Sequence, residues 1–308
     1  MRTRTASFAV ANRVRNAIAE GRPVVALEST IFTHGLPRPR NLEVAAAAED
    51  QLRSSGVEPA TIGVVDGVAT VGLTTDQITE LAGSDEAMKV SLRDLPVAYA
   101  SRASGGTTVA ATAYLAHRAG IAVFATGGLG GVHRDSSRTF DESADLPVLA
   151  QTPILMVSAG VKSILDVGAS LERLETLSIA VVGYGTTKFP GFYVADSGFT
   201  VKHAVASPEE AALLAAARDD LGLPGAIVVA NPVSPESELD PYEHERVVRE
   251  AWAAAEDAEI IGNDATPFLL DYIQIATNGR SLNVNVAVYE NNVRLAGDIA
   301  TALAPVPT

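Results

Sequence analysis

The chain uses lysine sparingly, and this makes each lysine a candidate for chemistry that arginine cannot perform. Among 23 basic residues only four are lysines, at positions 89, 162, 188 and 202. Arginine stays protonated in proteins, whereas lysine can lose its proton and attack carbon. Lys162 follows an apolar run at 154–157 and enters a segment typical of a helix, where the helix dipole and partial burial favour the neutral amine. Lys162 is therefore either a nucleophile or a phosphate-binding or surface lysine.

A cluster of oxygen donors precedes this lysine. Asp141, Glu142 and Asp145 lie within five residues of one another, and Ser143 falls between them. Mg²⁺ and Mn²⁺ prefer oxygen ligands, keep several waters and need only one or two carboxylates. The cluster is therefore a candidate metal site, although spacing alone favours a solvated acidic loop. A zinc site is not expected, because the chain has no HxxxH or HExxH pattern.

A single carboxylate, Glu28, stands directly after the apolar run 23–27. At the end of a predicted strand, such a residue is either a neighbour of a helix cap or a member of a site. In a site, it would supply the proton-transfer partner that an amine such as Lys162 needs.

The glycine-rich run from Gly127 to His133 follows another predicted strand, residues 121–125. Its GxGxxG register ends on His133, and no acidic residue stands where a ribose partner of a dinucleotide would be needed. A dinucleotide site is therefore poorly supported. The glycines indicate either a backbone that approaches an anion closely or a plain tight turn.

These residues need a scaffold of alternating strands and helices. Buried strands are predicted at 23–27, 61–65, 121–125, 154–157, 178–183 and 226–230, with helices between them, including an opening helix at 7–20 and one capped by Asn41. The Asp66-Gly67 pair predicts a tight hairpin, so part of the sheet is antiparallel. Without a linker or an internal repeat, residues 1–308 are predicted to form one α/β domain with a mixed, mainly parallel sheet flanked by helices.

Composition excludes several classes of protein. The hydrophobic fraction of 47% fits a globular protein, and no apolar run reaches the roughly 20 residues of a membrane span. The net charge of −14 argues against a nucleic-acid partner. Because there are no cysteines and no secretory signal pattern, we expect a cytoplasmic protein without disulfides.

Eight sequence blocks carry a resemblance to a known family. They are VALESTIFTHGLP (25–37), KVSLRDLP (89–96), GGTTVAAT (105–112), FATGGLGGVHR (124–134), FDESADL (140–146), SAGVKSILD (158–166), ANPV (230–233) and GNDATPFLL (262–270). Together they resemble the pseudouridine-5′-phosphate glycosidases and the related indigoidine-cluster A proteins. The match covers almost the whole chain in the same order.

The resemblance implies an enzyme that reversibly cleaves the C–C glycosidic bond of pseudouridine 5′-phosphate to uracil and ribose 5-phosphate. It implies assistance by one Mn²⁺ per subunit, with Mg²⁺ as a possible substitute, and a homotrimer. Glu28 falls on the family's proton donor, Lys162 on its covalent nucleophile and Asp141 on its metal ligand. The substrate-binding positions fall on Lys89, Val109, Thr126, His133, Ser143, Ala144, Asp145 and Asn285.

Two other functions compete with this one. The mechanism that the resemblance implies uses a Lys162 iminium with the ring-opened sugar, so a Schiff-base aldolase acting on another sugar phosphate would use the same lysine. A sugar-phosphate-binding regulatory protein would use Lys89 and Lys162 only as phosphate ligands. Uracil release distinguishes the glycosidase from the aldolase, and borohydride trapping with ribose 5-phosphate distinguishes both enzymes from the regulatory protein.

Overall fold

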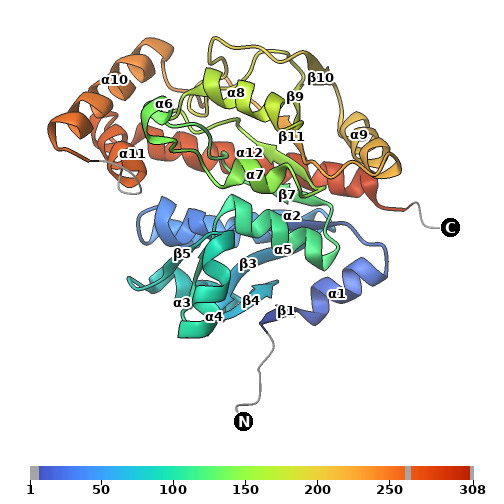
Figure 1. Ribbon diagram of the computed structural model, residues 1–308. Coiled ribbons are helices and arrows are strands. Elements are labelled where there is room, and N and C mark those ends of the chain that lie inside the picture. The colour runs from blue at the N-terminus through green and yellow to red at the C-terminus, as the bar shows by residue number, and fades with distance from the viewer. Residues whose placement is uncertain (1–6, 261–264, 306–308) are drawn as a thin grey trace.

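A single mixed sheet forms the centre of the computed structural model, which describes residues 7–260 and 265–305 (Figure 1). The strands follow the order β1-β4-β3-β2-β7-β8-β11-β9-β10, and β6 and β5 branch from β3. Their bounds are β1 Phe8–Val10, β2 Val24–Leu27, β3 Glu58–Val65, β4 Val68–Val71, β5 Met88–Val90, β6 Gly105–Thr107, β7 Val123–Ala125, β8 Leu155–Ser158, β9 Ala180–Tyr184, β10 His203–Val205 and β11 Ile227–Ala230.

Within residues 7–260 and 265–305, eight of the ten strand pairings are parallel, which confirms the predicted fold class. The two antiparallel pairings both involve β3, whose first half pairs with β2 and whose second half pairs with β4 and β6. The predicted hairpin joins β3 to β4, and Asp66 and Gly67 both have positive φ, as a tight hairpin turn requires. The long strand β3 therefore connects the main sheet to a smaller branch that carries β5.

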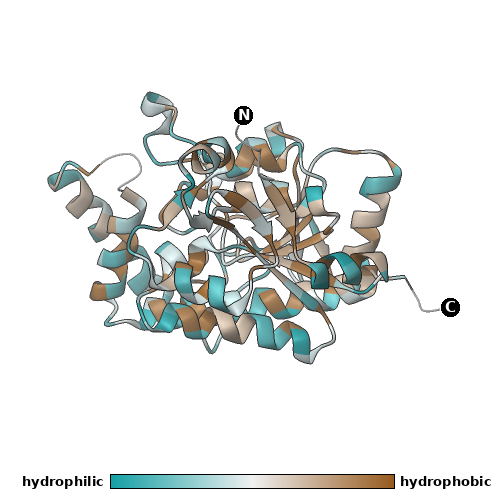
Figure 2. Cartoon of the chain, turned by 90° about the horizontal axis from the view of Figure 1, so that it is seen from below, coloured by the Kyte–Doolittle hydropathy of each residue, from teal (hydrophilic) through white to brown (hydrophobic). Residues whose placement is uncertain are grey.

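Helices cover both faces of the sheet. They are α1 Asn12–Ala19, η1 Ile31–Gly35, α2 Arg40–Ser54, α3 Thr75–Gly83, η2 Leu92–Asp94, α4 Leu95–Ser101, α5 Val109–Ala119, α6 Ser136–Thr139, α7 Asp145–Leu149, α8 Val167–Thr176, α9 Pro208–Asp220, α10 Pro241–Asp257, α11 Ala265–Ala276 and α12 Arg280–Leu303. Seen from below, apolar strands lie inside and the polar sides of the helices face outward (Figure 2).

Alternation along the strands creates a hydrophobic core on each side of the main sheet. In β2, Val24 and Ala26 join the core with α1, α5 and α7, whereas Val25 and Leu27 join the core with α2 and α12. Successive side chains of a strand point to opposite faces, so a strand buried on both faces must be apolar throughout. The near-continuous apolar runs of the sequence have this cause.

Two local predictions were wrong. Residues 8–10, predicted as the start of a helix, form β1, which pairs with β4. Asn41 lies inside α2 instead of capping it, and its side chain donates to the carbonyl oxygens of Phe32 and Ala82. Both errors arise because tertiary partners outweighed a local pattern.

The carboxyl ends of β2, β7 and β8 lie next to one another, because these strands are parallel neighbours. Glu28, Thr126 and the segment that carries Lys162 follow these three ends. In open α/β sheets, ligands bind at this edge.

Candidate active site

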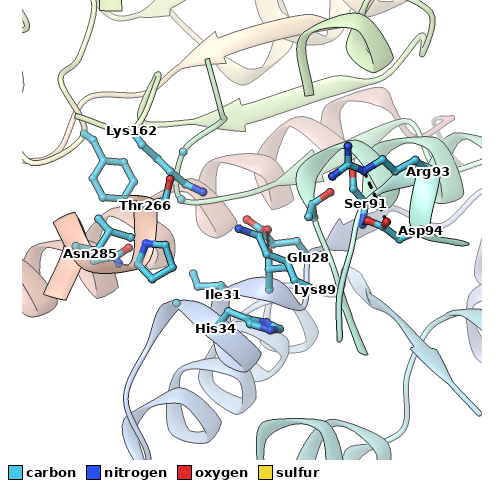
Figure 3. Close-up of a pocket in the computed structure, with 18 residues that line it drawn as sticks. Glu28, Ile31, His34, Lys89, Ser91, Arg93, Asp94, Lys162, Thr266 and Asn285 are labelled. Atoms are coloured by element: carbon cyan, nitrogen blue, oxygen red, sulfur yellow. Dashed lines mark hydrogen bonds and ion pairs between the residues drawn. The ribbon is translucent and has the colours of Figure 1, made fainter. Parts of the chain in front are cut away.

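A cleft with two connected lobes opens at this edge of the sheet. The lobes have volumes of about 450 and 260 Å³, and their shared wall includes Glu28, Lys89 and Lys162. In Figure 3, Glu28 and Lys89 lie in the middle, Lys162 reaches in from the β8 side, and Arg93 and Asn285 lie toward opposite ends. The strand ends, the β5 branch and α12 thus supply one site.

Glu28 is the most buried charged group of this wall, with 6% of its surface exposed. The hydroxyl of Thr126 donates to one carboxylate oxygen, and the hydroxyl of Thr30 donates to the other. Burial raises the pKa of Glu28, although the Lys162 ammonium and the two hydroxyl donors oppose this rise. The carboxyl therefore keeps its proton above the usual pH range and can act as an acid.

Lys162 lies in a turn after β8, and the helix predicted to begin there was wrong. The next helix, α8, begins at Val167, because Asp166 caps it by accepting from the amide of Ala169. The turn itself is fixed by the amide of Lys162, which donates to the carbonyl oxygen of Leu129 at 3.1 Å. No helix begins at Lys162, so a helix dipole does not act on its amine. The groups that line the cleft determine the environment of the amine instead.

Lys89 enters the cleft from β5, the outer strand of the smaller branch. Solvent reaches it through the mouth of the cleft, but the surrounding walls remove enough hydration to lower its pKa, and the nearby Lys162 adds to this effect. Asp145 and Glu28 act in the opposite direction. An acid with a raised pKa and an amine with a lowered one thus lie together, as in sites built for proton transfer.

The other two lysines lie elsewhere. Lys188 and Lys202 are exposed and form ion pairs with Asp196 and Glu175. The scarce lysines therefore divide into two cleft residues and two surface residues.

The three carboxylates of the acidic segment have three different surroundings. Both oxygens of Asp145 accept backbone amides, from Ala110 at 2.9 Å and Gly130 at 2.8 Å. Glu142 pairs with Arg173 at 2.8 Å. Asp141 remains half-exposed in the smaller lobe. Spacing alone favoured a solvated loop, but Asp145 in this segment is buried and bonded to two backbone amides.

Asp141 is the carboxylate of this segment that could hold a metal. The ring of His133 lies beside it, with Nδ1 3.8 Å from Oδ2. Among the described residues no group of three or more histidine, aspartate or glutamate side chains could enclose an ion. One accessible carboxylate beside a polar lobe fits a hard, water-rich cation such as Mn²⁺ or Mg²⁺, and does not fit zinc.

The glycine run permits close packing. A Cβ at Gly128 would lie 2.7 Å from Phe192, and one at Gly131 would lie 2.2 Å from the Ser170 hydroxyl. The amides of Gly130 and Val132 donate to Asp145 and Ser170, so these two amides are not available to an anion. For this part of the run, the tight-turn interpretation describes the structure.

The structure brings almost all predicted site residues to the cleft. Asn285 lines the larger lobe, and Val109, His133, Asp141, Ser143, Ala144 and Asp145 line the smaller one. Thr126 lies behind the wall, in contact with Glu28. Of the GNDATPFLL block, residues 262–264 lie outside the described part, while Thr266, Pro267 and Leu270 line the larger lobe.

Several residues that line the larger lobe were not among the predicted site residues, including His34, Ser91, Arg93 and Phe192. Ser91 and Arg93 follow β5 within the KVSLRDLP block, so polar residues after a short strand could have marked them. Phe192 comes from an irregular loop and has a positive φ, which no local pattern announces.

The family model described as indigoidine synthase A-like protein matches residues 13–302. A pseudouridine-5′-phosphate glycosidase of Saccharopolyspora erythraea is 64% identical over 96% of this chain and 97% of its own length. One of Streptomyces griseus is 56% identical over 94% and 90%. The chain belongs to the indigoidine synthase A-like family. It is an enzyme of the pseudouridine-5′-phosphate glycosidase group, as the sequence blocks predicted.

Two solved structures of indigoidine synthase A-like architecture resemble the whole chain. The prealnumycin C-glycosynthase AlnA, in complex with ribulose 5-phosphate, superposes with a TM-score of 0.90 at 35% identity over 97% of this chain and 98% of its own. An indigoidine synthase A-like protein from Thermotoga maritima gives 0.87 at 36% identity over 98% of each chain. Both confirm the fold of this family member.

The close packing of the glycine run predicts a selective effect of added methyl groups. Gly130→Ala would place a Cβ 2.2 Å from the Ser143 hydroxyl, so we expect a loss of about 1–3 kcal/mol in the free energy of unfolding. Gly83→Ala is the control, because open space surrounds Gly83 at the end of α3. It should leave stability unchanged or raise it by up to about 1 kcal/mol. Equal stabilities of the two variants in urea unfolding would contradict this explanation.

The burial that allows the Glu28 carboxyl to act as an acid should also lower the folding stability of the protein at neutral pH. Between the ordinary pKa of 4.5 and the raised pKa of the folded protein, the unfolded state releases a proton that the folded state retains. Folding stability therefore falls across this window as pH rises, and the penalty persists at neutral pH. Glu28→Gln removes it, so we expect a gain on the order of 1 kcal/mol at pH 7.5 that disappears below pH 4.5.

The control for this effect is Glu172→Gln on the exposed side of α8, which should change stability by less than about 0.5 kcal/mol. Unfolding in urea at several pH values measures both variants. A Glu28→Gln protein that is less stable than wild type at pH 7.5 would show that hydrogen bonds and Lys162 outweigh desolvation.

Proposed function

We propose that this enzyme reversibly cleaves the C–C glycosidic bond of pseudouridine 5′-phosphate to give uracil and ribose 5-phosphate. The observation that carries the proposal is the placement of a buried acid, Glu28, and an amine, Lys162, on one wall of a cleft. The glycosidases of Saccharopolyspora erythraea and Streptomyces griseus bear this activity in their names. The structural relative AlnA binds a pentose phosphate.

The reaction explains why an acid and an amine are both needed. The base leaves through carbon, so protonating a glycosidic oxygen or nitrogen cannot release it. Glu28 would donate its proton to the ring oxygen as the C1′–O4′ bond breaks, and the Lys162 amine would form a bond to C1′. The Lys162 nitrogen would then release a proton to the Glu28 carboxylate, and Glu28 would donate it to uracil C5. As the C1′–C5 bond breaks, its electron pair stays on uracil and the lone pair of the Lys162 nitrogen forms the C=N bond of an iminium. Water hydrolyses the iminium to ribose 5-phosphate and restores the amine.

The lining of the cleft supports this substrate. Lys89 and Arg93 supply positive charge for the phosphate, with the Ser91 hydroxyl beside them. In the larger lobe, the Asn285 amide offers the donor and acceptor that the imide of uracil can use, and Phe192 offers an apolar wall. The substrate-binding roles of Val109, Thr126, His133, Ser143, Ala144 and Asp145 likewise remain proposals.

Asp141 would hold the proposed Mn²⁺, with Mg²⁺ as a substitute. When bound there, the ion would supply positive charge and ordered water that stabilise negative charge developing on the substrate. The backbone amide of His133, which donates to the carbonyl oxygen of Asp141 at 3.1 Å, would help to position this residue.

Three further statements accompany this function as predictions: one glycosidase domain over residues 1–308, a homotrimer and a cytoplasmic location. Among the described helices, none has the length and apolar character needed to cross a membrane.

The decisive test of the proposal is uracil release from pseudouridine 5′-phosphate, followed by chromatography with and without Mn²⁺. Lys162→Arg keeps the positive charge but cannot form an iminium, so turnover should fall roughly a thousandfold or more. Lys202→Arg changes an exposed lysine in the same way and should keep full activity. Failure of the wild type to release uracil would refute the glycosidase, and an active Lys162→Arg variant would refute the covalent mechanism.

Borohydride trapping tests the covalent step separately. Wild-type enzyme with ribose 5-phosphate should gain one reduced sugar phosphate on Lys162, located by peptide mass spectrometry, and Lys162→Arg should gain none. An adduct without uracil release would favour the Schiff-base aldolase instead.

The metal assignment predicts a change in binding that does not depend on turnover. Asp141→Asn should weaken Mn²⁺ binding, measured by electron paramagnetic resonance on the protein alone, by more than about tenfold. Glu142→Gln is the control from the same loop, and because Arg173 already holds that carboxylate, its affinity should stay unchanged. Equal affinities in wild type and Asp141→Asn would place the ion elsewhere.

A further inference from the structure

Behind the cleft wall, two buried asparagines join the ends of three strands. Asn292 on α12 and Asn231 after β11 are 1% and 5% exposed. The Asn292 amide nitrogen donates to the carbonyl oxygens of Thr126 at 2.8 Å and Gly127 at 3.2 Å. Its oxygen accepts from the Asn231 amide at 3.0 Å. Every hydrogen-bonding group of the Asn292 side chain is therefore used, and its orientation is fixed.

Each end of this network leads to one of the two reacting groups. Thr126, whose carbonyl oxygen Asn292 holds, donates its hydroxyl to Glu28. The Gly127 carbonyl oxygen, which Asn292 also holds, accepts the amide of Ala159 at 2.9 Å, at the start of the segment that ends in Lys162.

Asn231 strengthens the connection between the Glu28 side and the Lys162 side of the cleft. The backbone amide of Asn231 donates to the carbonyl oxygen of Ser158 at 2.8 Å, so the end of β11 is also bonded to the end of β8. The Glu28 side and the Lys162 side of the cleft thus meet at one side chain.

We propose that Asn292 is a positioning residue that sets the placement of Glu28 relative to Lys162 and thereby the rate of the chemical step. Its catalytic consequence rests on the proposed glycosidase function. Asn292 touches neither the cleft nor the substrate position, so it acts through Thr126 and Gly127. The Asn292 side chain, whose nitrogen and oxygen are both bonded, holds two strand ends rigidly, whereas an aliphatic side chain of similar size would leave two buried carbonyl oxygens without this donor.

The surroundings of Glu28 determine the direction of the expected effect. Lys162 faces it from the turn after β8 and Lys89 from β5, Asp145 faces it from α7, and the buried phenol of Tyr289 lies near it on α12. The Thr126 hydroxyl is the donor through which the network reaches this group, and its hydrogen bond lowers the pKa of Glu28. Loosening Thr126 should therefore raise that pKa further.

The test compares Asn292→Leu with Asn41→Leu. Asn41 is 3% exposed and also donates to two carbonyl oxygens, of Phe32 and Ala82, so both variants lose similar contacts and should lose similar stability. We expect kcat for uracil release to fall roughly tenfold to a hundredfold in Asn292→Leu, with KM nearly constant and the alkaline limb of the pH profile at higher pH. Asn41→Leu should keep that limb at the wild-type position.

A direct readout makes the test independent of turnover. The carboxyl of Glu28, assigned by Glu28→Gln in ¹³C-glutamate-labelled protein, should titrate at higher pH in Asn292→Leu and in Thr126→Val than in wild type. Asn292→Asp, which keeps the shape but loses the donors, serves if the leucine variant does not fold. Thr126→Val combined with Asn292→Leu should lower kcat no more than the worse single variant, because both act on one connection.

An unchanged Glu28 titration in both Asn292 variants would overturn the proposal, as would a kcat no lower than that of Asn41→Leu. If wild type releases no uracil while the Glu28 titration shifts as expected, the glycosidase function fails and the positioning of Glu28 stands.

Discussion

The removal of water from Glu28 beside two lysine amines is the constraint on which this structure depends. A buried carboxyl keeps its proton more strongly, and a desolvated amine gives up its proton more readily. The pKa of Glu28 is raised and that of Lys89 is lowered, so the pKa values of an acid and an amine in the cleft come closer together, which favours proton transfer at this site. The fold must therefore hold these groups close together while it excludes enough solvent to maintain the shifts.

Parallel strands meet this requirement efficiently. The ends of β2, β7 and β8 lie side by side, so Glu28, Thr126 and the Lys162 segment meet without a long loop between them. Glycines at 128, 130 and 131 then let the turn after β7 approach Phe192, Ser143 and Ser170 at distances that a side chain would prevent. This close packing restricts the conformational freedom of the reacting groups, as a shorter loop would.

The sequence predicted the residues whose positions follow from strand ends, and it failed where positions depend on tertiary contacts. Glu28 and Lys162 could be found because each follows an apolar run, and the parallel sheet brings such positions together. The turn at Lys162 could not be found, since it is fixed by the carbonyl oxygen of Leu129, a residue more than thirty positions away. Phe192 and Asn292 carry no local signal, because an irregular loop delivers one and the other looks like any asparagine on a helix.

Lysine usage shows how a composition argument gains meaning only from the structure. Scarcity alone marked all four lysines as candidates, yet Lys188 and Lys202 lie at the surface in ion pairs where arginine would serve as well. Only Lys89 and Lys162 face a cleft where losing a proton has chemical value. A desolvated amine also needs rigid surroundings, since water that enters a loose cleft would restore its hydration. The bonded Asn292 side chain behind the wall and the acid–amine pair in front of it therefore serve the same requirement.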